Sequence, residues 1–354
     1  MMNVSAPLRL RLDGDALVHN WRWLARQGGA PAGAAIKANG YGLGARGVME
    51  RLFSAGCCDF FVATWAEAAA LMPLPPGARL AVLHGVREDD MPAALTLPAR
   101  PVLNSAAQIA RWHRDGASRS CDVMIDTAMN RLGCATNDLA ACSGLNIDIV
   151  MSHLASADTD SAQNAAQLSA FRAIAPSVGA RRASLANSAG ICLGPAYGFD
   201  LTRPGLSLYG GVPRAEAAEH IRAVVTIEAQ LLQRRIVRAG DSVGYGATWT
   251  ARRDTPVGIA NLGYADGYWR SFAGHGVAQA GDAALPLVGR VSMDLIALDM
   301  SAAPALDEGD WITLPLDLSI AAAATGMAQY ELLTGLAQRF ARVWGATSHA
   351  SPLV

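Results

Sequence analysis

Short apolar runs alternate with amphipathic helical patterns along the chain as far as Gly210. The first apolar run ends at Lys37, and helical patterns such as Trp65–Met72, Ala106–Arg114 and Ala162–Ile174 separate later runs. The later apolar runs are Asp59–Ala63, Arg79–Leu83, Arg100–Leu103, Cys121–Asp126, Ile147–His153, Arg182–Asn187 and Thr202–Tyr209. Eight strand–helix alternations in about 200 residues predict an α/β fold, a (β/α)8 barrel of the TIM type.

The pattern changes after Gly211. The strand-like runs become closely spaced and are separated by Gly, Asp or Pro turns. They are Val224–Ile236, Gly258–Ala265, Leu285–Val288, Val291–Met300 and Trp311–Leu314. We therefore expect a barrel over residues 8–219 and a mainly β domain over residues 220–354, with residues 1–8 as a candidate further strand of the second domain.

The segment Ala-Ala-Ile-Lys-Ala-Asn-Gly-Tyr-Gly-Leu-Gly, residues 34–44, concentrates candidate chemistry. A buried strand ending at Lys37 would place an amine at the C-terminal mouth of the barrel, where desolvation favours its neutral, nucleophilic form. The glycine-rich turn behind it offers backbone amides and Tyr41 to a phosphate. Taken alone, the segment more often marks a lysine that reaches solvent before an ordinary loop. Glu67, by contrast, is predicted to be a helix N-terminal charge and not a catalytic group.

Composition narrows the class of function. The 354 residues are 51% hydrophobic and 17% charged, with a net charge of −1 and no basic block, which argues against nucleic acid as a partner. The N-terminus lacks the apolar core of a signal peptide, and no run reaches the roughly 20 apolar residues of a membrane span, so we expect a cytoplasmic protein without a membrane partner. The six cysteines include no Cys-x-x-Cys, and the sequence predicts neither a metal site nor a disulfide framework.

Five motifs in a fixed order make the candidate site more specific. They are Ala35-Ile36-Lys37-Ala38-Asn39-Gly40-Tyr41-Gly42, Asp126-Thr127-Ala128-Met129-Asn130-Arg131-Leu132-Gly133, Asn187-Ser188 with Thr202-Arg203-Pro204-Gly205-Leu206-Ser207-Leu208-Tyr209-Gly210, Gly244-Tyr245-Gly246-Ala247-Thr248, and Gly289-Arg290-Val291-Ser292-Met293-Asp294. Through these motifs the chain closely resembles the alanine racemases, pyridoxal-phosphate enzymes built from a barrel and a β domain. The resemblance runs from about residue 8 to the C-terminal segment.

The resemblance implies a catalytic pair on opposite faces of a substrate. Lys37 would hold pyridoxal 5'-phosphate covalently and, once freed by an amino acid, would move the α-proton on one face. Tyr245 would be the base on the other face, because a single base can only return the proton where it came from. A tyrosine has an ordinary pKa of about 10, so Tyr245 needs a cationic environment, which His153 would provide by linking it to Arg203. Alone, Tyr245 would be a core aromatic residue of the β domain.

The resemblance also implies the remaining cofactor contacts. Arg203 would face the pyridine nitrogen; because arginine keeps its proton, the ring would be a weak electron sink, which favours racemisation over transamination. Alone, Arg203 would only cover the barrel rim. The other cofactor-binding residues would be Tyr41, His153, Asn187, Ser188 and the amides of Gly205 and Leu206.

Substrate binding is implied for residues of both domains. Arg131 would read the substrate carboxylate, and the Met293 amide of a second subunit would lie near it. Tyr264 and Asp294 would line the entrance, although Asp294 is equally typical of a turn anchor. Since Tyr245 and Met293 lie in the β domain, family geometry implies a homodimer whose sites are each built from two chains.

Two positions depart from the resembled family. Two residues before Asp126, many relatives have a lysine that becomes carbamylated and supports the substrate-binding arginine, whereas this chain has Met124. We expect Arg131 to be held by another acceptor, by water or by an anion such as chloride. Before the arginine matched by Arg339, many relatives have a tyrosine, and Gln338 here predicts a roomier pocket that admits serine or another small side chain.

The implied function is that of an isomerase that interconverts L- and D-alanine by two-base proton exchange, which supplies or consumes D-alanine for peptidoglycan. A broader racemase of small amino acids such as serine is the first alternative. A non-catalytic pyridoxal-phosphate carrier is the next, but such proteins resemble the barrel alone and have no domain bearing Tyr245. A decarboxylase of basic amino acids is disfavoured, because those enzymes place an acidic residue where this chain has Arg203.

Overall fold

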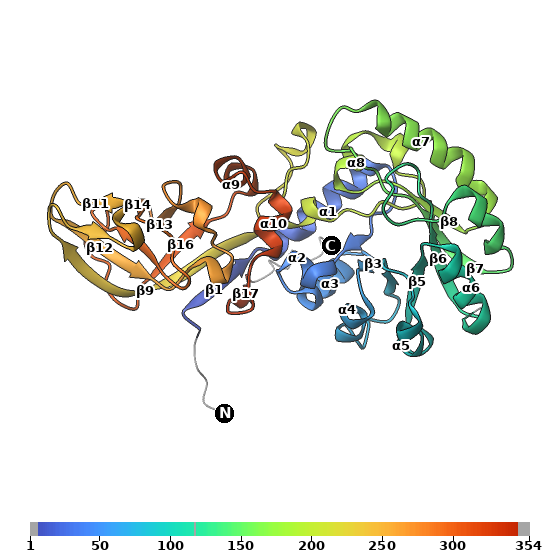
Figure 1. Cartoon of the computed structure of the whole chain (residues 1–354), viewed down its shortest axis with the longest axis horizontal. Helices are drawn as coiled ribbons and strands as arrows, with labels where there is room; N and C mark the ends of the chain where they lie inside the picture. Colours follow the sequence, from blue (N-terminus) through green and yellow to red (C-terminus); the bar gives the residue numbers. More distant parts are fainter. Residues whose placement is uncertain (1–5, 117, 346–354) are drawn as a thin grey trace, which may run out of the picture. The chain divides into compact units, whose positions relative to one another are not determined.

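The computed structural model describes residues 6–116 and 118–345, which form two compact units, each treated separately below. The barrel unit comprises residues 17–222. The β unit comprises the described residues up to 16 together with those from 223 onward. Figure 1 shows both with their element labels. Within the described ranges, no helix is both long enough and apolar enough to cross a membrane.

The barrel unit contains seven parallel strands that pair in sequence order. They are β2 (Ala34–Ala35), β3 (Asp59–Val62), β4 (Arg79–Val82), β5 (Ala99–Leu103), β6 (Ser120–Met124), β7 (Asn146–Met151) and β8 (Arg182–Ser184). The connecting helices are α3 (Ala45–Ser54), α4 (Trp65–Ala70), α5 (Met91–Thr96), α6 (Ala106–Asp115), the 3-10 helix η2 (Thr136–Cys142), α7 (Ala162–Ile174) and α8 (Ser188–Cys192). In Figure 1, α4, α5 and α6 lie along the outside of the strands. The prediction of a TIM-type α/β fold is confirmed.

The eighth place in the ring differs from the prediction of a strand at Thr202–Tyr209. Residues 200–204 fill it as extended backbone, and the amides of Asp200 and Arg203 donate to Ala183 and Ala186, 3.0 and 2.8 Å away. On the other side, the amides of Gly33 and Ala35 donate to Thr202 and Pro204, both at 2.9 Å. Pro204 has no N–H to continue a ladder, and Leu206–Tyr209 turns into the 3-10 helix η5.

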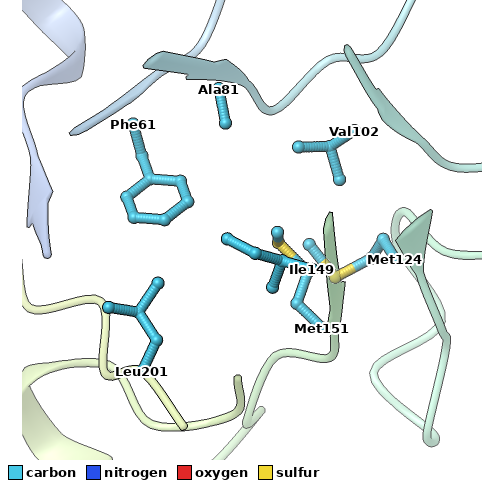
Figure 2. Close-up of a cluster of buried hydrophobic side chains, with 7 residues drawn as sticks. All are labelled: Phe61, Ala81, Val102, Met124, Ile149, Met151 and Leu201. Carbon is cyan, nitrogen blue, oxygen red and sulfur yellow. The ribbon is translucent and has the colours of Figure 1, made fainter. Parts of the chain in front are cut away.

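The barrel interior is built in layers because side chains on a strand alternate with a period of two. The middle layer is apolar, and Figure 2 shows its side chains pointing towards one another. Its buried members are Phe61, Ala81, Val102, Met124, Ile149, Met151 and Leu201. Two positions after Met124 and Met151, the chain reaches Asp126 and His153 at the C-terminal mouth.

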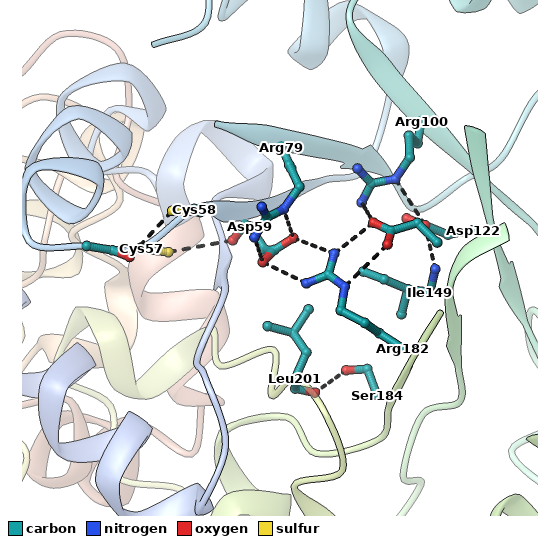
Figure 3. Close-up of polar contacts among 12 residues, drawn as sticks. Cys57, Cys58, Asp59, Arg79, Arg100, Asp122, Ile149, Arg182, Ser184 and Leu201 are labelled. Atoms are coloured by element: carbon teal, nitrogen blue, oxygen red, sulfur yellow. Dashed lines mark hydrogen bonds and ion pairs between the residues drawn. The ribbon is translucent and has the colours of Figure 1, made fainter. Parts of the chain in front are cut away.

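A layer of paired charges closes the opposite end of the barrel (Figure 3). Arg182 bonds Asp59 at 2.9 Å and Asp148 at 2.7 Å, and Arg79 bonds Asp59 at 2.7 Å. Arg100 pairs with Asp122 and Asp148 at 3.0 and 3.2 Å. Burial opposes ionisation of Asp59, but hydrogen bonds from Arg79 and Arg182 lower its pKa to about 2. Asp59 therefore contributes its full stabilisation above pH 3.8, its unperturbed pKa. This stabilisation is lost as the pH falls towards 2.

The β unit is organised around β9 (Val225–Val237). The first half of β9 pairs with β1 (Leu8–Leu12) and β16 (Trp311–Pro315), and its second half pairs with β12 (Thr255–Ala260), all antiparallel. The other strands are β10 (Ser242–Val243), β11 (Trp249–Thr250), β13 (Val277–Ala280), β14 (Ala283–Val288), β15 (Ile296–Asp299) and β17 (Ala341–Trp344). The helices are α9 (Leu318–Thr325) and α10 (Gln329–Thr334), and α1 (Gly14–Gly28) begins here and continues into the barrel unit.

The charged layer gives a direct stability test. Replacing Arg182 by Met leaves two buried carboxylates without one of their partners, and we expect a loss of about 3 kcal/mol in the free energy of unfolding, measured by urea denaturation. Arg238→Met is the matched control, because Arg238 pairs with Asp254 in solvent and its loss should hardly move the urea midpoint. Equal midpoints for the two variants would contradict a structural role of the layer.

Candidate active site

Lys37 stands where β2 ends and the chain enters a left-handed turn. Residues 38–41 all have positive φ, with values of 52, 53, 63 and 53°. The Lys37 side chain is half-buried, and within the described parts of the chain its amine has no hydrogen bond or ion pair. Burial and the charge of Arg131 lower the pKa of this amine, and Glu67 opposes them. Lys37 is also the sole lysine of the sequence, beside 28 arginines.

Arg203 belongs to the segment in the eighth place of the ring, and its side chain is buried. Its guanidinium donates to the carbonyl of Ser152 at 2.6 Å and to the hydroxyl of Ser184, which in turn donates to the carbonyl of Leu201. Burial lowers the pKa of Arg203 to about 10, and Asp122 opposes that effect. Arg203 therefore remains protonated at neutral pH, and an arginine has further N–H groups to offer a ligand.

His153 is placed after β7 and shares this mouth. Burial, followed by the charges of Arg203, Arg131 and Lys37, lowers its pKa to about 3. The imidazole is therefore neutral at physiological pH. Its backbone is fixed by Gln167, whose amide donates to the His153 carbonyl at 3.0 Å.

Tyr41, Ser188 and Gly205 come together from three different segments. The Ser188 hydroxyl accepts from the amides of Gly205 and Ser207 at 3.0 and 3.2 Å. A Cβ on Gly205 would lie 2.3 Å from the Tyr41 hydroxyl, so only glycine fits there. The Tyr41 ring stacks on Tyr209, with 4.7 Å between centroids. Hydroxyls and backbone amides with no carboxylate among them form a donor set suited to an anion.

Leu206 and Asn187 were also expected beside this group, and the two residues have different structural roles. Leu206 is buried and begins the 3-10 helix η5 directly after Gly205. Asn187 uses its side-chain oxygen to cap α8, accepting from the Gly190 amide at 2.8 Å. Asn187 thereby fixes the position of Ser188, the first residue of that helix.

Arg131 is exposed on the loop after β6, and no hydrogen bond or ion pair joins it to another residue that the structure describes. Met124 does not reach towards it. The Met124 side chain points into the apolar layer among Val102, Ile149 and Met151 (Figure 2). Of the partners expected for Arg131, a protein acceptor is thus not found among the described residues of the chain.

In the β unit, Tyr245 lies at the tip of the hairpin made by β10 and β11. Val243 and Trp249, the strand pair next to the tip, pack on the buried cluster that includes Val257 and Val288. The Tyr245 side chain is 72% exposed. A Cβ on Gly246 would lie 3.2 Å from the Arg290 guanidinium, so the tip lies against the turn that leads to Met293.

The remaining expected residues of the β unit form a second connected group. The amides of Tyr264 and Ala265 donate to the carbonyls of Ser292 and Met293 at 3.0 Å each. Arg339 bonds both Asp266 and Asp294 at 2.7 Å, so Asp294 does anchor neighbouring loops. Met293 is 53% exposed. Gln338, next to Arg339, is also exposed.

Comparison with known proteins identifies the family. Residues 12–213 match the family "Alanine racemase, N-terminal domain", and residues 224–344 match "Alanine racemase, C-terminal domain". The chain belongs to the alanine racemase family. It is 39% identical to the alanine racemase of Acidiphilium cryptum, over 94% of this chain and 98% of that protein. It is 41% identical to the catabolic alanine racemase of Agrobacterium fabrum, over 94% and 91% of the two chains.

Solved structures agree with this assignment. The alanine racemase of Bartonella henselae with covalently bound pyridoxal phosphate superposes with a TM-score of 0.87 at 33% identity, covering 96% of this chain and all of that one. The biosynthetic alanine racemase of Pseudomonas aeruginosa gives a TM-score of 0.86 at 33% identity, covering 97% of this chain and all of that one.

Some residues that position the site of this alanine racemase family member lie outside the motifs. Ser152, Ser184 and Gln167 fix Arg203 and His153, yet each is an ordinary polar residue of a strand end or helix in the sequence. Ser152 lies two positions after Val150, a buried residue of β7, and that spacing was its available signal, whereas Ser184 ends β8 and follows Arg182, which is not buried. Nothing local marks Gln167, because its partner lies 14 residues away.

The sole lysine makes its amine directly measurable. In protein treated with hydroxylamine, which removes carbonyl compounds from lysine, the pH midpoint for labelling the Lys37 peptide, followed by mass spectrometry, should lie below 10.5. In Arg131→Ala the midpoint should rise, because a nearby positive charge is removed. Arg172→Ala, on the outer helix α7, is the control that should not move it. A wild-type midpoint at or above 10.5 would contradict the site electrostatics.

Proposed function

We propose that this chain is an alanine racemase that interconverts L- and D-alanine with pyridoxal 5'-phosphate. The observation that carries the proposal is the arrangement at the barrel mouth. The sole lysine of the chain, with a lowered pKa, shares that mouth with the buried, protonated Arg203 and the anion-binding group of Tyr41, Ser188 and Gly205. The relatives named above support alanine as the substrate.

The residues present fit this cofactor. Lys37 would bind its aldehyde carbon, and Arg203 would face its ring nitrogen. Its phosphate would be held by Tyr41, Ser188 and the amides at Gly205 and Leu206, where glycine at position 205 lets the Tyr41 hydroxyl approach the backbone closely. When bound, the cofactor supplies an electron sink that acidifies the α-proton of an attached amino acid.

The protein residues then control where the proton goes. The Lys37 amine, easier to deprotonate than a free lysine, takes or returns the α-proton on one face. The Tyr245 hydroxyl oxygen does so on the other face. Arg203 donates a hydrogen bond but retains its proton, which limits the electron withdrawal and disfavours transamination. Arg131 fixes the substrate carboxylate, assisted by the Met293 amide.

We further propose that the site is shared in a homodimer. Tyr245 and Met293 are 72% and 53% exposed, whereas a base that moves protons selectively has to be shielded from water. Coverage of this surface by the barrel mouth of a second subunit would provide the shielding. Tyr264 and Asp294, tied to the same loops, would then line the entrance.

The proposed physiological role is the supply or consumption of D-alanine for peptidoglycan in the cytoplasm. Both biosynthetic and catabolic alanine racemases are among the relatives. A broader action on serine is the second candidate, favoured by Gln338 where many relatives have a tyrosine. Arg131 would be partnered by water or by an anion such as chloride. A racemisation rate that is unchanged when chloride is removed would favour water.

Racemisation assays test the proposed reaction. The wild-type chain should racemise L-alanine, and Lys37→Ala should abolish this activity, because both the cofactor anchor and one base are lost. Tyr245→Phe should lower the rate about 10²- to 10⁴-fold, since it removes one proton-transfer group, while Tyr197→Phe is the control. L-serine and L-lysine are run in parallel. Turnover of lysine alone, or an active Lys37→Ala variant, would refute the proposal.

Subunit complementation tests the shared site. If each site combines Lys37 of one chain with Tyr245 of the other, a heterodimer of Lys37→Ala and Tyr245→Phe chains contains one intact site. Random exchange of the two inactive dimers should therefore restore about a quarter of wild-type activity. Sites built within single chains would give no restoration, because every site would carry one substitution.

A further inference from the structure

The Glu67 carboxylate joins backbone amides of two separate loops. One oxygen accepts from the Ala38 amide at 2.6 Å, within the left-handed turn that follows Lys37. The other oxygen accepts from the amides of Ala63 and Thr64 at 2.7 and 3.2 Å, where β3 ends and α4 begins. These loops follow adjacent parallel strands, since β2 pairs with β3.

Helix capping explains only part of this arrangement. Thr64 and Glu67 form a capping box at the start of α4, which confirms the prediction of a helix N-terminal charge. The cap, however, uses only the Thr64 amide, at the longest of the three distances. Glu331 shows what capping alone requires, because it occupies the corresponding place in α10 and accepts only from Ala328, at 2.8 Å, among the described residues.

The turn that Glu67 contacts is strained. Ala38, Asn39 and Tyr41 carry side chains yet have φ values between 52 and 53°, a region that L-residues other than Asn seldom occupy because the Cβ approaches the following carbonyl oxygen. Such conformations persist only where surrounding contacts impose them. Within the turn, the amides of Gly40, Gly42 and Gly44 donate to Ile36, Ala38 and Asn39. The contact from the amide of Ala38 to Glu67 ties this turn to the rest of the barrel.

We propose that Glu67 is a positioning residue that clamps the left-handed turn and thereby holds Lys37 in its productive place at the barrel mouth. The proposal deepens, and for its kinetic consequence rests on, the proposed racemase function. The clamp acts at the residue directly after Lys37, so its loss changes the direction in which the Lys37 side chain leaves the backbone. A base displaced by even about 1 Å can lose about a hundredfold in rate.

Glu67 also contributes charge at this position. The charged groups acting on Lys37 are Arg131 and Glu67, and His153 and Arg203 belong to the same mouth. Removal of the carboxylate leaves the effect of Arg131 on the amine without the opposing effect of Glu67. A loss of clamping and a loss of charge therefore both act on Lys37, and neither acts on the exposed Arg131 side chain directly.

The experiment compares Glu67→Ala with two matched variants of the purified holoenzyme. Thr64→Ala weakens the α4 cap but keeps the Glu67 carboxylate, and Glu331→Ala removes a capping carboxylate far along the chain. Hydrogen–deuterium exchange of the peptide containing residues 38–41 reports the clamp, and kcat and KM for alanine report its consequence. Glu67→Gln, which keeps the shape but only one acceptor oxygen, serves if Glu67→Ala does not fold.

We expect Glu67→Ala to speed exchange in residues 38–41 and to lower kcat about ten- to a hundredfold with a smaller change in KM. Thr64→Ala and Glu331→Ala should leave both quantities near wild-type values while lowering thermal stability. If Glu67→Ala behaves like Thr64→Ala in exchange and kcat, Glu67 is only a helix cap and the inference is overturned. If the wild-type chain racemises nothing, the proposed function fails, and the exchange comparison still decides the clamp.

Discussion

The barrel mouth contains more positive charge than its carboxylates balance, and the chemistry of the site follows from that imbalance. Lys37, Arg131 and Arg203 surround His153, whose pKa falls to about 3 as a result of burial and these charges. A buried neutral imidazole can stay beside a buried guanidinium, whereas an imidazolium could not. The same field favours the neutral amine of Lys37 and attracts anions. A bound phosphate or substrate carboxylate would therefore add the negative charge that the residues of the mouth lack.

At the opposite end of the barrel, the positive charges of the arginines are balanced by carboxylates of the protein. There, Asp59, Asp122 and Asp148 balance Arg79, Arg100 and Arg182, and the pairs need no ligand. The apolar layer, which includes Met124, lies between the two ends and keeps them chemically separate. Because inward side chains repeat every second residue, a single strand supplies all three environments, as β6 does with Asp122, Met124 and, just beyond it, Asp126. The alternation of the strands thus assigns stability to one end and binding to the other.

Most of the barrel followed from periodicity, and the failures have physical causes. Strands β3 to β8 begin within one residue of the predicted starts, because buried parallel strands are continuous apolar runs. The run Thr202–Tyr209 is apolar as well, but Pro204 ends its ladder and the chain turns into a 3-10 helix. The sequence indicates a turn after Lys37 through Asn39 and Gly40, but it does not indicate that Ala38 and Tyr41, poor residues for positive φ, are left-handed as well. Tertiary contacts impose it, and the one from Glu67 comes from 29 residues away. Pattern alone cannot show such a contact.

In the β unit, the candidate base Tyr245 lies on a packed hairpin and is exposed to solvent. The hairpin that carries Tyr245 is anchored, because it packs through Val243 and Trp249 on a buried cluster. The same hairpin leaves the Tyr245 side chain 72% exposed. The hairpin therefore positions the backbone of Tyr245 but does not shield its phenol from water. A packed hairpin with an uncovered side chain suits a surface that a second surface completes, since little backbone ordering entropy remains to be lost on association. If the barrel mouth of another subunit covers Tyr245, its unbalanced positive charge would supply the environment in which a tyrosine can serve as a base.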